Sequence, residues 1–235
     1  MQAIVLAGGK GKRLWPLTSK IPKPLVSILQ KPILRYHLEW LYSEGVREVV
    51  VACGYMSDSI IEYLEKNPIK NLSVKFSIES KPLGRAGATK QAVNLLSRPE
   101  KVVIVSHVDI ISNISLGQAL QLQRRLDSML TLILVPYRSS FGIVEVDERD
   151  LVKDFQEKPI LPYWVNSGIY VAHPDFFIKL PGKGDEEMTI RKLLKERCVS
   201  GFCDSEHYWR AIDTQKDLIE VENDIKHHAY FPSFL

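Results

Sequence analysis

The most informative stretch of the chain, residues 6–25, reads LAGGKGKRLWPLTSKIPKPL and joins a glycine-rich turn to two cations in fixed positions. Three glycines follow the apolar run at 4–6: Gly8, Gly9 and Gly11. Such a turn lets several backbone N–H groups approach phosphate oxygens with no Cβ in the way. Arg13 adds a permanent planar charge that suits phosphate, and Lys23 lies between two prolines that restrict where its ammonium can point. The run therefore predicts a polyphosphate site; a plain structural turn with solvated lysines is the alternative.

Two better-known phosphate motifs do not fit this turn. The dinucleotide fingerprint needs a third glycine at the position that holds Leu14. The P-loop needs Ser or Thr after Gly-Lys, whereas Arg13 follows Lys12 here. The turn therefore belongs to neither class.

An aspartate that follows a second apolar run is a candidate metal ligand. Asp109 lies just beyond the apolar residues 102–105. A carboxylate at the end of a strand can hold Mg²⁺, which keeps several waters and bridges triphosphate oxygens. A helix cap or a turn aspartate is the alternative. We interpret His107 beside it as a structural histidine.

The elements that must position these residues alternate between strand and helix in the first half of the chain. Apolar runs predict strands at 3–6, 48–53 and 102–105, and an alternating pattern predicts one at 72–78. Helical spacing predicts helices at 33–43, 57–66, 86–96 and 116–126. Strands separated by helices of this length imply βαβ units and a parallel sheet. Ligands bind such sheets beyond the carboxyl ends of the strands, where the glycine turn, the loop after Ile78 and Asp109 all fall.

The second half has a different pattern. Strands are predicted with short connections at 130–135, 142–146, 151–155 and 165–171, and helices at 174–180, 187–197 and 216–225. Short connections suggest antiparallel pairs added to the parallel core. We therefore predict an α/β fold of Rossmann-like, three-layer α/β/α type, with a mixed, mainly parallel central sheet.

Composition and charge exclude several classes of protein. The 235 residues carry a net charge of only +3, which is too mild to indicate a nucleic-acid partner. No apolar run approaches the length needed to span a bilayer, so no membrane partner is expected. The three cysteines cannot all pair, which fits a reducing compartment. With a strand predicted at residues 3–6 in place of a signal peptide, a cytoplasmic protein is expected.

The order Gly-Gly-x-Gly-x-Arg-Leu followed by Pro-Lys-Pro resembles the signature of the sugar-1-phosphate nucleotidyltransferases. Further segments in family order extend the resemblance over residues 1–225, and residues 21–42 are most similar to the mannose-1-phosphate guanylyltransferase branch. The resemblance implies the fold of the nucleotide-diphospho-sugar transferases in one domain, 1–235. A nucleotide-binding half at 1–130 and a sugar-phosphate half at 131–225 are expected, with a tail at 226–235.

The resemblance also implies roles for individual residues. Arg13 and Lys23 are expected to be catalytic. The expected nucleotide-binding residues are Leu6, Ala7, Gly8, Gly9, Gly11, Lys81 and Gly84. The expected sugar-phosphate-binding residues are Gly142, Glu157, Lys158 and Asn166. Asp109 and Asp213 are expected to bind Mg²⁺, although Asp213 also suits the N-cap of the last helix and Glu157 with Lys158 also suits a surface ion pair.

By the same resemblance, the chain transfers a nucleotidyl group from a nucleoside triphosphate to a sugar 1-phosphate and releases pyrophosphate. GTP and mannose 1-phosphate are the first expectation. UTP or dTTP with glucose 1-phosphate, or CTP, stay open because four residues depart from the family pattern: Lys81, Arg85, Val108 and Asp213. Ala211 replaces a metal-binding aspartate of the family, and Val108 replaces a small residue beside Asp109. A non-catalytic homologue that binds nucleotide sugars and regulates a partner therefore also stays open. A homo-oligomer is a further expectation.

Overall fold

The protein is described by a computed structural model that covers residues 1–99 and 101–227. Its central sheet consists of β1 (Gln2–Leu6), β4 (Glu48–Cys53), β5 (Ser73–Ile78), β6 (Val103–His107), β8 (Leu130–Arg138), β11 (Ile160–Ala172) and β12 (Val199–Cys203). The strand order is β12-β8-β11-β6-β1-β4-β5. Strand β11 runs antiparallel to both of its neighbours, and the other pairs are parallel. The predicted mixed, mainly parallel sheet is confirmed.

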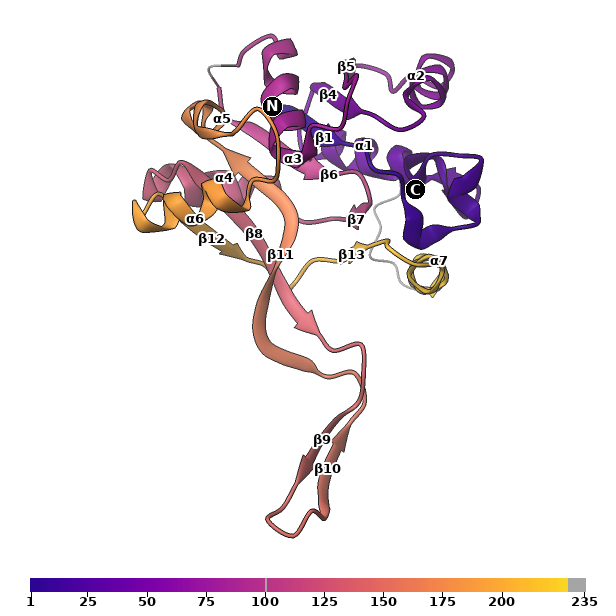
Figure 1. Cartoon of the computed structure of the whole chain (residues 1–235), viewed down its shortest axis with the longest axis vertical. Helices are drawn as coiled ribbons and strands as arrows, with labels where there is room; N and C mark the ends of the chain where they lie inside the picture. The colour runs from indigo at the N-terminus through magenta and orange to yellow at the C-terminus, as the bar shows by residue number, and fades with distance from the viewer. Residues whose placement is uncertain (100, 228–235) are drawn as a thin grey trace.

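Helices cover both faces of the sheet, as the predicted three layers require (Figure 1). On one face lie α1 (Ile33–Ser43), α2 (Ser57–Lys66) and α4 (Leu116–Leu126), and on the other α3 (Gly84–Ala92), α5 (Pro174–Lys179) and α6 (Glu187–Lys195). Alternate residues of β1 pack against the helices on opposite faces of the sheet. Ala3 and Val5 belong to one core cluster and Ile4 to the other. Burial on both faces explains why the predicted strands read as continuous apolar runs.

A third, smaller core holds the edge of the molecule that carries the glycine turn. Helix α7 (Gln215–His227) packs there with Leu218 and Val221 against Leu14, Ile28 and Tyr36. The short elements around it are β2 (Ser27–Ile28), β3 (Lys31–Pro32), β7 (Ile110–Ser112), β13 (Trp209–Ala211) and the 3₁₀ turns η1 (Lys12–Leu14), η2 (Leu17–Ser19) and η3 (Lys23–Leu25); η4 (Val93–Leu95) extends α3. Most of the predicted tail at 226–235 lies outside the described residues. Within them, every helix is too short or too polar to cross a bilayer.

The strands predicted at 142–146 and 151–155 form, but they do not join the central sheet. Strands β9 (Ile143–Val146) and β10 (Val152–Gln156) pair only with each other in the described residues. They make a two-stranded hairpin that projects from the body at the lower end of Figure 1. We call residues 139–160 the arm. The alternating pattern of each strand predicted its conformation but carried no information about its pairing partner.

Five strands of the structure were missed, and two of them, β2 and β3, have only two residues each. Strand β12 adds a parallel edge strand beside β8, and β7 pairs with β13. Both β7 and β13 have only three residues, which is too short for a periodic pattern. Strand β12 reads Val-Ser-Gly-Phe-Cys, with a glycine that obscures its alternation.

Candidate active site

The glycine turn begins where β1 ends, at the carboxyl edge of the sheet, as predicted. Gly11 has a φ of 59°, a conformation that favours glycine. A Cβ at this position would lie 2.9 Å from the Cβ of Lys23 and 3.1 Å from Cγ2 of Thr18. The Thr18 hydroxyl donates a hydrogen bond to the Gly11 carbonyl at 2.9 Å. Glycine at position 11 therefore allows the turn to close against Lys23 and hold its stem in place.

The two cations and the two carboxylates singled out from the sequence meet in one cluster. The ammonium of Lys23 lies 2.5 Å from Oδ2 of Asp109 and 3.0 Å from Oδ1 of Asp213. The guanidinium of Arg13 lies 2.7 Å from the same oxygen of Asp213. The Lys23 side chain is only 12% exposed, whereas that of Arg13 is 71% exposed. Lys23 is therefore a nearly buried cation shared by two carboxylates, with Arg13 at the solvent side.

The short pairing of β7 with β13 brings Asp213 to Asp109. Ala211 lies opposite Ile110 in this ladder, and the Ile212 N–H donates to the carbonyl of Asp109 at 2.9 Å. Asp213 is the next residue, so its carboxylate reaches the end of β6 from the far end of the chain. This ladder is the reason that Asp213, and not position 211, supplies the second carboxylate of the cluster.

The structure excludes the helix-cap alternative for Asp213. Helix α7 begins at Gln215. The Thr214 hydroxyl accepts a hydrogen bond from the Asp217 N–H at 3.3 Å, and the Asp217 carboxylate accepts from the N–H groups of Thr214 and Asp213. Thr214 and Asp217 thus cap the helix reciprocally. The side chain of Asp213 faces the cations instead.

A pocket of about 310 Å³ opens beside this cluster. Five of the predicted nucleotide-binding residues line it: Leu6, Ala7, Gly8, Gly9 and Gly84. Gly11 lines an adjoining pocket of about 260 Å³ with Lys12 and the four members of the cluster. Lys23 and Asp109 belong to both pockets. Six of the seven predicted nucleotide-binding positions therefore line two adjoining pockets that meet at Lys23 and Asp109.

Lys81 is the predicted nucleotide-binding residue that lies elsewhere. It is exposed in the loop after β5 and does not line either of these two pockets. Gly84 lines the first pocket, but its missing Cβ serves the fold: φ is 74°, and a Cβ would lie 2.5 Å from the Gly184 carbonyl oxygen. The close approach at Gly84 is thus to the loop at 182–184, which the sequence did not reveal.

Glu79 lines the first pocket and was missed. Its Oε2 accepts a hydrogen bond from the Leu83 N–H at 2.7 Å. Its Oε1 lies so close to Gly8 and Gly54 that a Cβ on either would come within 2.6 and 2.7 Å of it. The available signal was its position directly after a predicted strand, at the same sheet edge as the glycine turn.

A polar pocket of about 570 Å³ lies on the other side of the cluster and shares Arg13, Asp109 and Asp213 with the adjoining pocket. Asn166, predicted to bind sugar phosphate, lines it and donates to the Tyr170 hydroxyl at 2.9 Å. Burial raises the pKa of Tyr170 to about 12, so its hydroxyl stays protonated.

The wall of this pocket also holds a neutral histidine. Burial lowers the pKa of His107, and its Nε2 has no hydrogen-bond partner among the described residues. On the same wall, Arg85 pairs with the buried Glu186 at 3.3 Å. Hydrogen-bond donors and acceptors are therefore available for a polyhydroxylated ligand.

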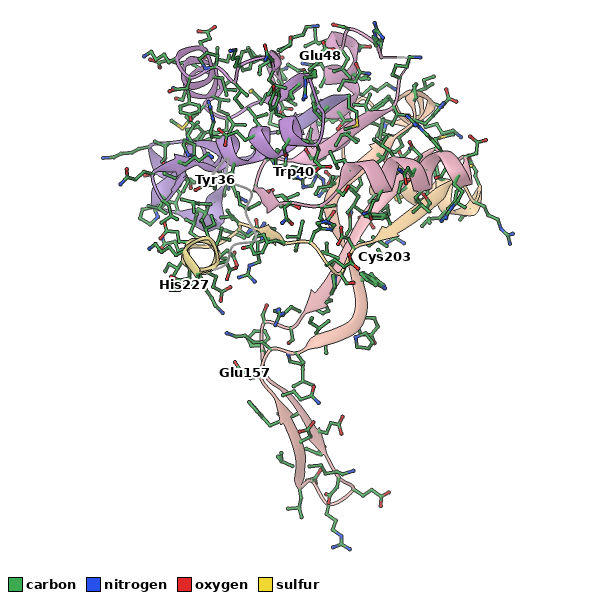
Figure 2. The ribbon with its side chains drawn as sticks, turned by 180° about the vertical axis from the view of Figure 1, so that it is seen from behind. Tyr36, Trp40, Glu48, Glu157, Cys203 and His227 are labelled. Atoms are coloured by element: carbon green, nitrogen blue, oxygen red, sulfur yellow. The ribbon has the colours of Figure 1, made fainter. Side chains whose placement is uncertain are left out.

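The other three predicted sugar-phosphate residues lie at the root of the arm. Figure 2 shows Glu157 where the hairpin leaves the body. A Cβ on Gly142 would lie 3.2 Å from the Glu157 carboxylate, so these two residues adjoin each other. Lys158 lines a separate pocket of about 900 Å³ together with Asp213. The structure thus brings Gly142 and Glu157 together but places them outside the pocket that holds Asn166.

The donor set suits a divalent cation that is completed by substrate. Among residues 1–99 and 101–227, no group of three or more His, Cys, Asp or Glu side chains is arranged to hold a metal. Asp109 and Asp213 are a pair within reach of one ammonium. Mg²⁺ is commonly held by one or two carboxylates with waters and substrate phosphates, so two aspartates beside a phosphate-binding turn fit this ion.

Solved structures define the class of protein to which this fold belongs. HddC from Yersinia pseudotuberculosis, in complex with GMP-PN, is 26% identical and superposes with a TM-score of 0.76 over 95% of this chain and 99% of that chain. A putative glucose-1-phosphate thymidylyltransferase from Bacillus anthracis shares the fold with a TM-score of 0.77 at 18% identity, over 100% of this chain and 99% of that one. The fold is that of the sugar nucleotidyltransferases.

Sequence comparison gives the family directly. The nucleotidyl transferase family matches residues 2–228, and the chain belongs to this family. A mannose-1-phosphate guanyltransferase of Yarrowia lipolytica is 31% identical over 93% of this chain and 62% of its own length. The mannose-1-phosphate guanylyltransferase catalytic subunit beta of Drosophila pseudoobscura pseudoobscura is 32% identical over 93% of this chain and 60% of its own. The chain thus spans about three fifths of these relatives.

Proposed function

We propose that this protein transfers a nucleotidyl group from a nucleoside triphosphate to a sugar 1-phosphate, with GTP and mannose 1-phosphate as its substrates and GDP-mannose and pyrophosphate as its products. The observation that carries the proposal is the charged cluster of Arg13, Lys23, Asp109 and Asp213. It lies where the pocket of the glycine turn meets the polar pocket of Asn166. Two substrates bound in these pockets would bring their phosphates together at the cluster.

The reaction is an in-line displacement at phosphorus. A phosphate oxygen of the sugar 1-phosphate forms a bond to the α-phosphorus, and the bond from that phosphorus to the β-phosphate oxygen breaks as pyrophosphate leaves. No covalent bond to the protein is required, so catalysis consists of alignment and charge stabilisation.

Each residue of the cluster has a place in this scheme. The glycine turn holds the phosphates with backbone N–H groups, and Arg13 neutralises the leaving pyrophosphate. Lys23 stabilises charge at the α-phosphate, and its 12% exposure strengthens that interaction. Asp109 and Asp213 would hold Mg²⁺, which neutralises charge on the phosphate oxygens when bound.

Glu79 supports guanine as the base. Guanine presents two adjacent donors, N1–H and the 2-amino group, whereas uracil and thymine present one N–H between two carbonyls. An ionised carboxylate only accepts hydrogen bonds. Its two oxygens can accept from both guanine donors, whereas the carbonyl oxygens of the pyrimidines repel it. Glu79 is a carboxylate that lines the nucleotide pocket. The names of the relatives from Yarrowia and Drosophila point to the same base and to mannose 1-phosphate.

The proposal is tested by pyrophosphate release across a grid of GTP, UTP, CTP, dTTP and ATP against mannose, glucose and N-acetylglucosamine 1-phosphates, with Mg²⁺ present. GTP with mannose 1-phosphate should give the highest kcat/KM, and Arg13→Ala should abolish most of that signal. A different preferred pair would overturn the substrate assignment. Silence across the grid, with GDP-mannose still raising the Tm, would favour a regulatory binder of nucleotide sugars.

A further inference from the structure

A buried histidine that the proposed mechanism does not use contacts both sides of the turn that carries Asp109. This turn joins β6 to β7. His37 lies on α1 and is 1% exposed. Its Nδ1 is 3.0 Å from the carbonyl oxygen of Ile110, the first residue of β7, and its Nε2 is 2.8 Å from Oγ of Ser106 in β6. One imidazole therefore bridges the strands on either side of the turn.

The two partners of His37 determine which ring nitrogen carries the proton. A carbonyl oxygen only accepts hydrogen bonds, so Nδ1 donates to Ile110. Burial lowers the pKa of His37 to about 4, so the imidazole is neutral and its Nε2 accepts from the Ser106 hydroxyl. Both nitrogens are thus satisfied in the core, where an unpaired polar group is costly. An aliphatic side chain at position 37 would supply neither bond.

Two backbone hydrogen bonds support the same turn from other directions. The Val108 N–H donates to the carbonyl of Leu6, at the end of β1, at 3.1 Å. The Asp109 carbonyl accepts from the Ile212 N–H at 2.9 Å. These bonds hold the middle of the turn, whereas His37 holds its two ends. Because a backbone held at its ends and its middle has little freedom to rotate, these supports together set the direction of the Asp109 side chain.

The charged cluster leaves little tolerance in that direction. The Lys23 ammonium lies 2.5 Å from Asp109 and 3.0 Å from Asp213. A shift of about 1 Å would break one of these contacts. Mg²⁺ demands near-ideal octahedral geometry with bonds of about 2.0 to 2.1 Å to its oxygen ligands, so it requires the same two carboxylates to be placed at least as accurately. The supports of the Asp109 turn therefore bear directly on cation binding.

We propose that His37 is a positioning residue for Asp109: its two hydrogen bonds fix the turn between β6 and β7 so that the Asp109 carboxylate faces Asp213 and the pair can bind one Mg²⁺. His37 acts through the backbone of the turn and through Ser106. The proposal rests on the proposed function, in which these two carboxylates hold the cation. Removal of an outer-shell partner of a metal ligand weakens metal binding by roughly 10- to 100-fold. We expect about tenfold here, because His37 acts through one further bond.

The same helix offers a matched control. Trp40, labelled in Figure 2, lies three residues further along α1 and is 3% exposed. Its Nε1 donates to the carbonyl of Ile114 at 3.1 Å, beyond the end of β7. Trp40→Phe therefore removes one hydrogen bond between α1 and the segment that follows β6, but it leaves the supports of the Asp109 turn in place. A loss of stability that is not specific to the turn should appear in this variant as well as in variants of His37.

Calorimetric titration of Mg²⁺ into the nucleotide-free protein, with the Tm of each variant, tests the proposal without an activity assay. His37→Leu removes both hydrogen bonds and should raise the Kd for Mg²⁺ about tenfold. His37→Gln, whose amide can donate and accept, should have a Kd between those of His37→Leu and the wild type. Trp40→Phe should lower the Tm but keep the wild-type Kd. An unchanged Kd in His37→Leu, or an equal rise in Trp40→Phe, would overturn the proposal.

A second variant keeps the test decisive if His37→Leu does not fold. Ser106→Ala removes the hydroxyl that donates to His37 and leaves Nδ1 bound to Ile110. Its Kd for Mg²⁺ should also rise, and a wild-type Kd in this variant would contradict the proposal.

Initial rates of pyrophosphate release at a series of Mg²⁺ concentrations give a second readout. The Mg²⁺ concentration for half-maximal turnover should rise in His37→Leu and Ser106→Ala, and saturating Mg²⁺ should restore much of kcat, which a general loss of stability would not produce. A wild type that binds no Mg²⁺ and releases no pyrophosphate would count against the proposed function. A wild type that does both, beside variants with the same Mg²⁺ dependence, would count against the role of His37 alone.

Discussion

Replacement of Lys23 by methionine should have two opposite effects, one on turnover and one on cation binding. Methionine has nearly the length of lysine but no charge. In the free protein the Lys23 ammonium occupies the space between Asp109 and Asp213, at 2.5 and 3.0 Å from their oxygens. Mg²⁺ bound by the same carboxylates must compete with that ammonium. Lys23→Met should therefore bind Mg²⁺ more tightly in the absence of nucleotide, although it loses turnover.

The size of the effect follows from Coulomb's law. The ammonium carries one charge and Mg²⁺ two, so at about 5 Å apart they repel by roughly 7 kcal/mol at an effective dielectric constant of about 20. The Asp213 side chain is 32% exposed, so solvent screens more than half of this repulsion. We expect about 2 to 3 kcal/mol of tighter binding, which corresponds to a factor of tens to roughly one hundred in Kd. Turnover should fall by a factor on the order of 100 to 1000, as on removal of one preorganised donor to the reacting charge.

Calorimetric titration of Mg²⁺ into the nucleotide-free protein measures the first effect, and initial rates of pyrophosphate release measure the second. Lys20→Met is the control, since Lys20 is exposed in the same segment. Its Mg²⁺ affinity and turnover should match those of the wild type. An unchanged Mg²⁺ affinity in Lys23→Met would refute the reasoning that the ammonium and the cation share one pair of carboxylates.

Three further predictions concern other parts of the molecule. Arg13→Ala should lower kcat by a factor of roughly 100 to 1000 while Lys20→Ala leaves it unchanged, and near-normal rates in the first variant would contradict the role of Arg13. Glu79→Gln should raise the KM for GTP about 10- to 100-fold in initial-rate assays, because an amide cannot accept both guanine donors; an unchanged KM would remove Glu79 from base recognition. Burial lowers the pKa of His37 from 6.5 to about 4. Because the folded state resists protonation of His37, the free energy of unfolding should have its full value above pH 6.5 and fall by about 3 kcal/mol as the pH drops toward 4. Urea unfolding at a series of pH values measures this change. His37→Gln should flatten this dependence, and an equal slope would exclude His37 as its source.

The central sheet was predictable because its strands are buried on both faces. Strands β1, β4 and β6 read as apolar runs, and the edge strand β5 alternates between polar and apolar residues. Helices separate these strands, and the order of such units restricts the topology to few choices. The pairing of the second half was not predictable in the same way. Strand β11 runs for 13 residues, and its mostly exposed first half stays paired with the end of β8 as it leads to the arm. The alternation of a strand predicts which of its faces is apolar, but it does not predict which part of the protein packs on that face.

The charged cluster was predictable where each residue directly follows a strand or belongs to a compact motif. Arg13, Lys23 and Asp109 satisfy this condition. Asp213 was assigned through the resemblance, and its physical explanation, the three-residue ladder between β7 and β13, is too short to be read from the sequence. Glu79 was overlooked in favour of Lys81, two positions further along the same loop. The direction of a side chain in a loop depends on backbone contacts such as the one between Glu79 and the Leu83 N–H, which periodicity does not encode.

The most direct test of the central claim follows the phosphates of GTP into the products. GTP labelled at the α-phosphorus and, separately, at the γ-phosphorus is incubated with mannose 1-phosphate, Mg²⁺ and the protein, and the products are separated. We expect the α-label in GDP-mannose and the γ-label in pyrophosphate, with both transfers lost in Arg13→Ala. Release of the γ-label as inorganic phosphate, or an α-label that never enters a nucleotide sugar, would contradict the account.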